Sequence, residues 1–308
     1  MNIRVEPGTW VVAVSGGVDS MVLLDLVHQL QLRRPDDYTF TVAHFDHGIR
    51  PDSSEDRRLV QQQARTFRLP FVYEEAHLGA GTSEAVAREA RYAFLERVCQ
   101  AVKAQGIMTA HHQDDVLETA AHHLLRGTGR RGVSALTEHL RRSRPLLAKS
   151  KRRLQEYARS HDVQWREDST NQDLRYTRNY IRHQVLAKSM PAERAQLIAI
   201  INKTQELNQE IDELLANTLH MQPHARQLSR RWFIGLPHAV AREVLYAWFR
   251  THNIQGIQRA MIERAVIAIK TGRSGKCYGV DKHHTLLLSK SVAELTDRST
   301  PQLKRKSV

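Results

Sequence analysis

Residues 10–20 read WVVAVSGGVDS, and this stretch decides the fold. Its first five residues are apolar and mostly β-branched, which predicts a buried parallel strand. The strand is expected to end at Ser15, and from Val18 onwards the apolar residues take the spacing of a helix. A strand end, a glycine turn and a helix start together present unpaired backbone N–H groups and a positive helix dipole. The stretch therefore predicts a binding site for a multiply charged anion.

The two glycines of this stretch suit a phosphate-binding loop. Without a Cβ, Gly16 and Gly17 let the backbone approach an anion closely. An ordinary turn between a strand and a helix is the alternative, because paired glycines are common. The full pattern SGGxDS directly after a strand is more specific, and since no lysine follows the glycines it differs from the P-loop. The predicted phosphate-binding residues are Ser15, Gly16, Gly17, Val18, Asp19 and Ser20.

Composition limits the classes of protein to which this chain can belong. Its 308 residues are enough for two or three domains. The formal net charge of +13, from 46 basic against 33 acidic residues, favours a polyanionic partner, although basic proteins without one exist. The two cysteines, Cys99 and Cys277, have no metal-like spacing, which argues against a disulfide framework, a zinc site or a redox pair. Neither a signal-peptide pattern nor a long apolar run is present, so we expect a cytoplasmic protein without a membrane segment.

Strand and helix patterns alternate through residues 1–125. This alternation predicts an α/β fold with a parallel sheet and helices on both faces, in which ligands bind at the carboxyl ends of the strands. Ser15, His44 and His111 lie at predicted strand ends and are expected to converge. The further strands are predicted at residues 38–44, 70–73 and 107–110, and the helices at residues 52–67, after a cap at Thr82 or Ser83, and at residues 114–126.

The pattern changes after residue 126. Residues 127–153 predict a loop with a short helix and an irregular strand, and residues 150–160 a helix. Residues 190–221 predict one long helix or a broken pair. A separate, mainly helical α+β domain follows, with helices at residues 239–251 and 257–271 and a hairpin through residues 279–283 into 285–288. The expected division is therefore 1–188, a linking helix over 189–222, a C-terminal domain over 223–298 and a basic, disordered tail over 299–308.

A second cluster of polar residues, AHHQDDVLET, occupies positions 110–119. Asp115 and Glu118 are three residues apart at a predicted helix start, so both carboxylates are expected on the same side. Acids in a first turn also stabilise the helix dipole, but three acids beside two histidines at a strand end favour a functional site. Two such acids could hold Mg²⁺ opposite phosphate oxygens or bind a cationic amine, and a histidine could stabilise charge on a departing phosphate.

Seven segments along the chain carry a resemblance to a known family. They are residues 15–20, DHGIR at 46–50, AREARY at 87–92, 111–119, LRGTG at 125–129, WREDSTN at 165–171 and RNYIR at 178–182. In this order they resemble the ATP-pyrophosphatase, or PP-loop, family, and within it the tRNA(Ile)-lysidine synthetases. The resemblance covers nearly the whole chain and fits a short form without a second C-terminal domain. It implies a sheet of the adenine nucleotide alpha-hydrolase-like type.

The resemblance also implies an activity. Members of that family use ATP and Mg²⁺ to join L-lysine to C2 of the wobble cytidine of tRNA(Ile) with anticodon CAU. The reaction passes through an adenylated cytidine and gives lysidine, AMP and pyrophosphate. Residues 1–188 would then be the ATP-binding synthetase domain and residues 223–298 a tRNA-binding domain. The oligomeric state stays open, a homodimer included.

The resemblance assigns roles to individual residues. Asp115 and Glu118 would recognise the substrate lysine, and Asp19 and Asp114 are candidate Mg²⁺ ligands. Arg91 matches an arginine important for activity, although an exposed helix arginine is the alternative. One of the two histidines at positions 111 and 112 could simply close a strand. The expected catalytic residues are Asp19, Arg91, His111, Asp115 and Glu118.

A basic run follows the second cluster. Between residues 126 and 153 there are ten Lys or Arg residues against one acid, Glu138, which favours an RNA channel over a solvated face. One departure from the family pattern is Ala187, where a proline is common; Pro191 comes later, which shifts a helix start. The expected tRNA-binding residues are Arg126, Arg130, Arg131, Arg178 and Arg182.

Two rival functions remain at this point. A tRNA thiolase of the same PP-loop group shares the loop and the basic charge, but such enzymes need paired cysteines or an iron–sulfur cluster, which Cys99 and Cys277 do not suit. A non-catalytic tRNA-binding protein with a relic nucleotide site is the second. The intact SGGxDS loop and the acids Asp115 and Glu118 argue against it.

Overall fold

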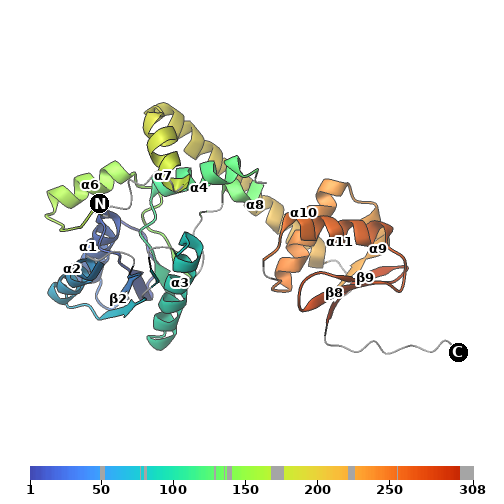
Figure 1. Ribbon diagram of the computed structural model, residues 1–308, viewed down its shortest axis with the longest axis horizontal. Coiled ribbons are helices and arrows are strands. Elements are labelled where there is room, and N and C mark those ends of the chain that lie inside the picture. Colours follow the sequence, from blue (N-terminus) through green and yellow to red (C-terminus); the bar gives the residue numbers. More distant parts are fainter. Residues whose placement is uncertain are drawn as a thin grey trace. The chain divides into compact units, whose positions relative to one another are not determined.

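The computed structural model describes residues 1–48, 53–76, 78–79, 82–127, 130–134, 136, 141–167, 177–220, 226–254 and 256–298. The chain divides into two units, Met1–Gln205 and Glu206–Val308 (Figure 1). Several positions discussed above lie outside the described residues: Ile49, Arg50, Thr128, Gly129, Glu138, residues 168–171 and the tail 299–308.

The first unit is built on a five-stranded parallel sheet, which confirms the predicted fold class. Along the chain the strands are β1 (Gly8–Ala13), β2 (Tyr38–Asp46), β3 (Phe71–Glu75), β4 (Gly106–Met108) and β5 (Arg142–Ser143), and in the sheet they lie in the order β3-β2-β1-β4-β5. The strand order reverses at β1, because β2 and β3 extend the sheet on one side and β4 and β5 on the other. In such sheets the ligand crevice lies at the reversal, outside the carboxyl ends of the strands.

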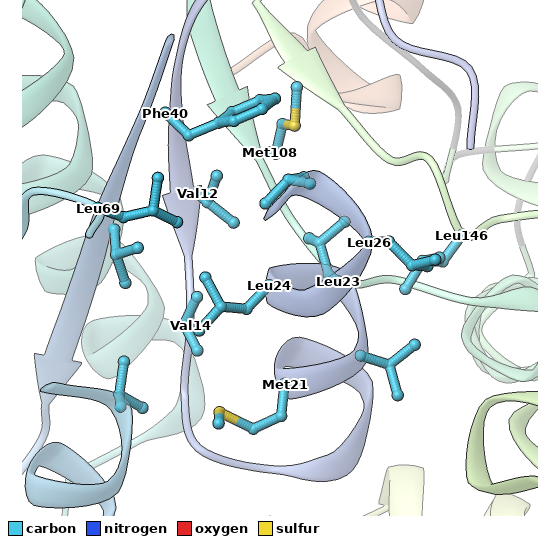
Figure 2. Packing of buried hydrophobic residues seen from close by; sticks show 14 of the residues in the cluster. Val12, Val14, Met21, Leu23, Leu24, Leu26, Phe40, Leu69, Met108 and Leu146 are labelled. Carbon is cyan, nitrogen blue, oxygen red and sulfur yellow. The ribbon is translucent and has the colours of Figure 1, made fainter. Parts of the chain in front are cut away.

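Helices cover both faces of this sheet. Alternate residues of β1 point to opposite sides, so that Val12 packs with one layer and Val11 with the other. The first layer contains α1 (Val18–Arg33), α2 (Ser53–Thr66) and α6 (Lys151–Ser160), and Figure 2 shows Val12 and Val14 beside Leu24 of α1. The second layer is α3 (Glu84–Ala101), which lies on the other side of the sheet in Figure 1.

Three helix starts follow from local sequence. The Ser83 hydroxyl accepts from the Val86 N–H at the start of α3, so Ser83, one of the two predicted caps, begins this helix. Ser150 caps α6 in the same way. Pro191 is the first residue of α8 (Pro191–His220), where its missing N–H has no cost. Helix α8 is continuous, which answers whether this segment is one helix or two.

The segments between β4 and α8 form a smaller core. Helix α4 (Gln113–Leu125) contributes Val116, Leu117 and Ala120, which pack with Ile181 and Ile201. The connecting elements are α5 (Arg130–Val133), α7 (Thr177–Tyr180), a π-helical turn over Ile181–Val185 and a 3-10 turn over Leu186–Lys188.

The second unit combines helices with a four-stranded antiparallel sheet in the order β6-β9-β8-β7. After α8, its elements are β6 (Gln227–Ser229), α9 (Arg230–Ile234), α10 (His238–Thr251), α11 (Arg259–Thr271), β7 (Cys277–Gly279), β8 (His284–Leu288) and β9 (Val292–Asp297). The predicted hairpin is present, whereas β6 and β9 have no counterpart in the sequence prediction.

The core of the second unit includes Trp248, Phe249 and Phe233. The buried Arg230 donates to the carbonyl oxygens of Ile269, Ser289 and Gly272, which ties α9 to α11 and to the sheet.

Among the helices that the structure describes, none is long and apolar enough to cross a membrane.

Candidate functional site

A cavity of about 330 Å³ opens at the carboxyl ends of β1, β2 and β4. Ser15 and Gly17 after β1, His44 in β2 and His111 after β4 all line it. The predicted convergence of Ser15, His44 and His111 is therefore confirmed. The cavity lies where the strand order reverses, as expected for a ligand site in this fold.

The side chain of Ser20 holds the SGGxDS loop in shape. Its Oγ accepts from the N–H groups of Ser15, at 3.1 Å, and Gly16, at 3.2 Å, and donates to the carbonyl oxygen of Gly17, at 2.9 Å. The Ser20 hydroxyl therefore orders the loop from inside. The N–H groups left for an anion are those of the first turn of α1, which have no partner within the helix.

Gly16 has a φ of +96°, a conformation that favours glycine. A Cβ at this position would lie 3.2 Å from the Cβ of Asp56 in α2. On the backbone side, the Arg166 N–H donates to the Gly16 carbonyl oxygen at 3.0 Å. The loop is thus held between α2 and the segment that follows α6.

The side chain of Arg166 closes this arrangement. Its Nε donates to Asp56 Oδ1 at 2.8 Å, and its Nη1 pairs with Glu55. Asp56 is buried and lines the cavity, so this ion pair fixes the wall against which Gly16 packs. Arg166 is separated from Asp56 by 110 residues, and its bond to Gly16 joins two segments of the sequence resemblance, 165–171 and 15–20.

We expect Arg166→Ala to raise the KM for ATP about tenfold, because a small displacement of a positioned loop weakens binding in the productive geometry. Arg166→Lys keeps the charge but not the forked geometry, and an intermediate value is expected. Initial rates at varied ATP concentrations measure both. Arg152→Ala is the control, since the Arg152 side chain is 88% exposed and its ion pair among the described residues is with Glu156 of its own helix. An unchanged KM in Arg166→Ala would show that the pair does not position the loop.

Asp19, in the first turn of α1, lies between Lys151 and His112. Lys151 Nζ is 2.6 Å from its Oδ2, and His112 Nε2 is 3.5 Å from the same atom. Burial alone raises the pKa of Asp19, but hydrogen bonding and charge from His112 and Lys151 outweigh it and lower the pKa. Asp19 Oδ1 is buried and has no hydrogen-bond partner within the described part of the chain. Asp19 is therefore an ionised carboxylate with one oxygen available.

The pKa values of the two histidines at the start of α4 are shifted in opposite directions. Burial, with the nearby Arg144, Arg91 and Arg88, lowers the pKa of His111 to about 4 against the opposing effect of Asp115. For His112, burial also lowers the pKa, but Asp19 and Asp115 outweigh burial and raise it. His111 is thus neutral near pH 7, with its Nδ1 2.8 Å from the Thr109 hydroxyl.

The predicted pair of acids is divided between two environments. Asp115 lines the cavity, and its carboxylate accepts from the His112 N–H at 2.9 Å. Glu118 does not line the cavity; it is 1% exposed and bound by Arg182 through contacts of 2.6 and 2.9 Å. Arg178 lies 3.9 Å from the same carboxylate. Asp115 therefore faces the cavity, whereas Glu118 faces the protein interior.

The other predicted site residues have these positions. Arg91 lines the cavity from α3. Asp114 does not; its Oδ2 accepts from the Lys151 N–H at 3.2 Å and joins α4 to α6. Arg126 follows α4, and Arg130 and Arg131 lie in α5, outside the cavity lining. No group of three or more His, Cys, Asp or Glu residues suited to a metal ion occurs among the residues that the structure describes.

Sequence reasoning missed Asp56, Lys151 and Arg166 as site residues. Lys151 lies in the basic run, where nothing separated it from neighbouring cations. Asp56 is in a first helical turn, where the helix dipole already explains an acid. Arg166 belongs to the WREDSTN segment, and only its contacts with α2 reveal its place.

Comparison with known proteins places the chain in a family. The PP-loop domain family matches residues 2–189. A tRNA(Ile)-lysidine synthase from a Nostoc species is 32% identical over 265 residues, covering 84% of this chain and 74% of the relative. The Coxiella burnetii relative of the same name is 31% identical, covering 82% of this chain and 58% of the relative.

Coverage and fold add two further facts. A Thermotoga relative of that name is 39% identical over 186 residues, and this match covers 44% of the relative, so the chain spans about half the length of several relatives. A U34-tRNA thiolase from Methanococcus maripaludis shares the fold, with a TM-score of 0.53 and 13% identity over 66% of this chain and 73% of that chain. By its PP-loop domain and its likeness to the Nostoc relative, the chain belongs to the tRNA(Ile)-lysidine synthase branch of the PP-loop family.

Proposed function

We propose that this chain joins L-lysine to C2 of the wobble cytidine in the CAU anticodon of tRNA(Ile), consuming ATP and forming lysidine, AMP and pyrophosphate. The observation that carries the proposal is that the SGGxDS loop and Asp115 face one cavity. Membership of the tRNA(Ile)-lysidine synthase family supports the choice of substrates. Since such tRNA is used in translation, we place the reaction in the cytoplasm.

In this proposal the ATP phosphates bind at the SGGxDS loop. The first turn of α1 offers N–H groups and the positive end of the helix dipole, and Gly17 leaves space for a close approach. Arg91 faces the same cavity and supplies a cation for the α-phosphate. These groups hold the phosphorus atom in place for attack.

Asp19 is the residue best suited to Mg²⁺. Its carboxylate is ionised, and its buried Oδ1 has no hydrogen-bond partner within the described residues. Proteins commonly hold Mg²⁺ with one or two carboxylates, completed by phosphate oxygens and waters. Bound there, Mg²⁺ would neutralise phosphate charge. Asp114 remains a second candidate ligand.

The chemistry consists of two displacements. The cytosine O2 attacks the α-phosphorus, the bond to the β-phosphate oxygen breaks, and pyrophosphate leaves. The neutral ε-amine of lysine then attacks C2, the C2–O bond breaks with AMP as the leaving group, and the amine loses a proton. Single-stranded RNA is read by splaying out its bases, so the wobble base enters the cavity unstacked.

Asp115 is proposed to receive the lysine ε-amino group. It is the acid of α4 that lines the cavity, and an ionised carboxylate attracts an ammonium group. The neutral His111 beside it can exchange a hydrogen bond without adding positive charge. Glu118 is proposed to position α4, because its carboxylate is bound by Arg182 and so joins α4 to the π-helical turn over Ile181–Val185.

The tRNA contact is proposed for the basic run after α4. If Arg130 and Arg131 each neutralise a phosphate, replacing both by alanine lowers the slope of log affinity against log salt by about two. Filter binding of tRNA between low and moderate salt measures this slope. The matched control replaces Arg58 and Arg65, two exposed arginines of α2, and leaves the slope unchanged. Equal slopes in both double variants would remove Arg130 and Arg131 from the contact.

The reaction itself is tested with isotope-labelled lysine, ATP and a tRNA carrying the CAU anticodon. Nucleoside mass spectrometry is expected to place the label on the wobble cytidine. A thiolase has less support, since Cys99 lies within α3, Cys277 is exposed in β7, and neither lines the cavity. Sulfur in the recovered nucleoside, or no labelled nucleoside at all, would contradict the proposed function.

A further inference from the structure

His44 lies in the wall of the cavity, and one of its ring nitrogens has no hydrogen-bond partner in the described part of the chain. The residue lies in β2, is 3% exposed and lines the cavity. Its Nδ1 is 2.8 Å from the carbonyl oxygen of Val14. A carbonyl oxygen can only accept, so Nδ1 carries the proton and Nε2 carries a lone pair. The backbone at Val14, directly after β1, thereby fixes one tautomer.

The ring is held in its neutral form. Burial lowers the pKa of His44, and the charge of Arg57 acts in the same direction. The hydrogen bond to Val14 and the carboxylates of Asp46 and Asp56 raise the pKa but do not outweigh burial. At neutral pH the Nε2 atom is therefore a hydrogen-bond acceptor and not a donor.

Nε2 is buried and has no hydrogen-bond partner among the residues that the structure describes. Because Nδ1 is directed at the backbone, Nε2 is the polar atom of this side chain left for a molecule in the cavity. Buried polar atoms in folded proteins are nearly always paired, so an orphaned acceptor in a cavity wall points to a ligand donor.

The position of His44 indicates which part of a nucleotide lies near it. Strand β2 pairs directly with β1, and the Val14 N–H donates to the Ala43 carbonyl oxygen at 3.0 Å. His44 is thus one strand away from the SGGxDS loop. In doubly wound sheets that hold phosphates after the first strand, the end of the second strand contacts the nucleoside half.

We propose that His44 Nε2 accepts a hydrogen bond from the adenosine half of ATP, and that His44 is a specificity-determining residue. The inference rests on the proposed function, because it assumes that the phosphates lie at the SGGxDS loop. Adenosine offers two kinds of donor, the ribose hydroxyls and the exocyclic amine of adenine. A nucleotide that lacks the donor leaves the buried nitrogen unpaired, which is how polar sites reject close analogues.

The test compares nucleotide affinities of the full chain by calorimetry. The ligands are ATP, 2′-deoxy-ATP, 3′-deoxy-ATP and inosine triphosphate. At least one analogue is expected to bind about tenfold or more weakly than ATP. A loss with a deoxy analogue identifies a ribose hydroxyl as the donor, and a loss with inosine triphosphate identifies the amine.

Two variants separate the acceptor from the fold. His44→Asn can keep the donor to Val14 but has nothing at the Nε2 position, and it is expected to bind ATP and the rejected analogue equally. His44→Gln can place its amide oxygen near the Nε2 position and is expected to retain part of the discrimination. Equal binding of all four nucleotides by the unmodified chain, or full discrimination in His44→Asn, would overturn the role of His44. Failure of the unmodified chain to bind ATP would instead contradict the proposed function itself.

Discussion

Asp115→Asn is expected to lower the rate of lysine incorporation by about two to four orders of magnitude, as for the loss of a group that handles charge or a proton in catalysis. Asp115 lines the cavity, and the change removes its negative charge while keeping the carbonyl oxygen that accepts from His112. Initial rates with labelled lysine measure the loss. Filter binding is expected to show little change in tRNA affinity, because Asp115 lies apart from the basic run.

Two further variants identify the cause of that loss. Asp115→Ala also removes the acceptor of the helix cap, and a cap of this kind contributes about 1 kcal/mol to stability. A lower unfolding temperature is therefore expected in Asp115→Ala but not in Asp115→Asn. Glu156→Gln is the control, since the Glu156 side chain is 60% exposed and does not line the cavity. Undiminished turnover in Asp115→Asn would refute the role of this acid in lysine recognition.

Gly16→Ala is expected to weaken ATP binding by about one to two orders of magnitude, because relieving about 1–3 kcal/mol of backbone strain displaces the loop from its binding conformation. An alanine at this position would have to adopt a φ of +96°, and its Cβ would lie 3.2 Å from the Cβ of Asp56. The loop must shift, since Arg166 holds its carbonyl oxygen and Ser20 its N–H group. Calorimetric titration with ATP measures the effect.

Two glycines serve as controls for this change. Gly79 also has a positive φ, of +74°, but open space around its Cβ position, so Gly79→Ala tests backbone strain alone. Gly279 has neither a positive φ nor a close contact at its Cβ position, and Gly279→Ala is expected to bind ATP as the unmodified chain does. If Gly16→Ala bound ATP as tightly as Gly79→Ala, the close packing against Asp56 would have no part in shaping the loop.

The central part of the first unit could be predicted because its signals are local. Most of β1, the glycine turn and the start of α1 lie within residues 10–20, where the β-branched residues favour a strand and the glycines permit the turn. The parallel sheet follows from the alternation of strands and helices. In the second unit, β6 and α9 have three and five residues, too few to show a periodicity.

The contacts within the site could be predicted only in part. Side chains three residues apart on a helix differ by about 60° in direction, which is enough for Asp115 to face the cavity while Glu118 faces the interior. The choice between these directions depends on where Arg182 lies, and that depends on the fold after α6. The ion pair of Arg166 and Asp56 joins residues 110 positions apart, which no local pattern encodes.

A crystal structure of the chain with a non-hydrolysable ATP analogue tests the account most directly. The triphosphate is expected against the first turn of α1, with its α-phosphate toward Arg91 and the nucleoside beside His44. A nucleotide whose phosphates bind at any other surface, with the SGGxDS loop left empty, would contradict it.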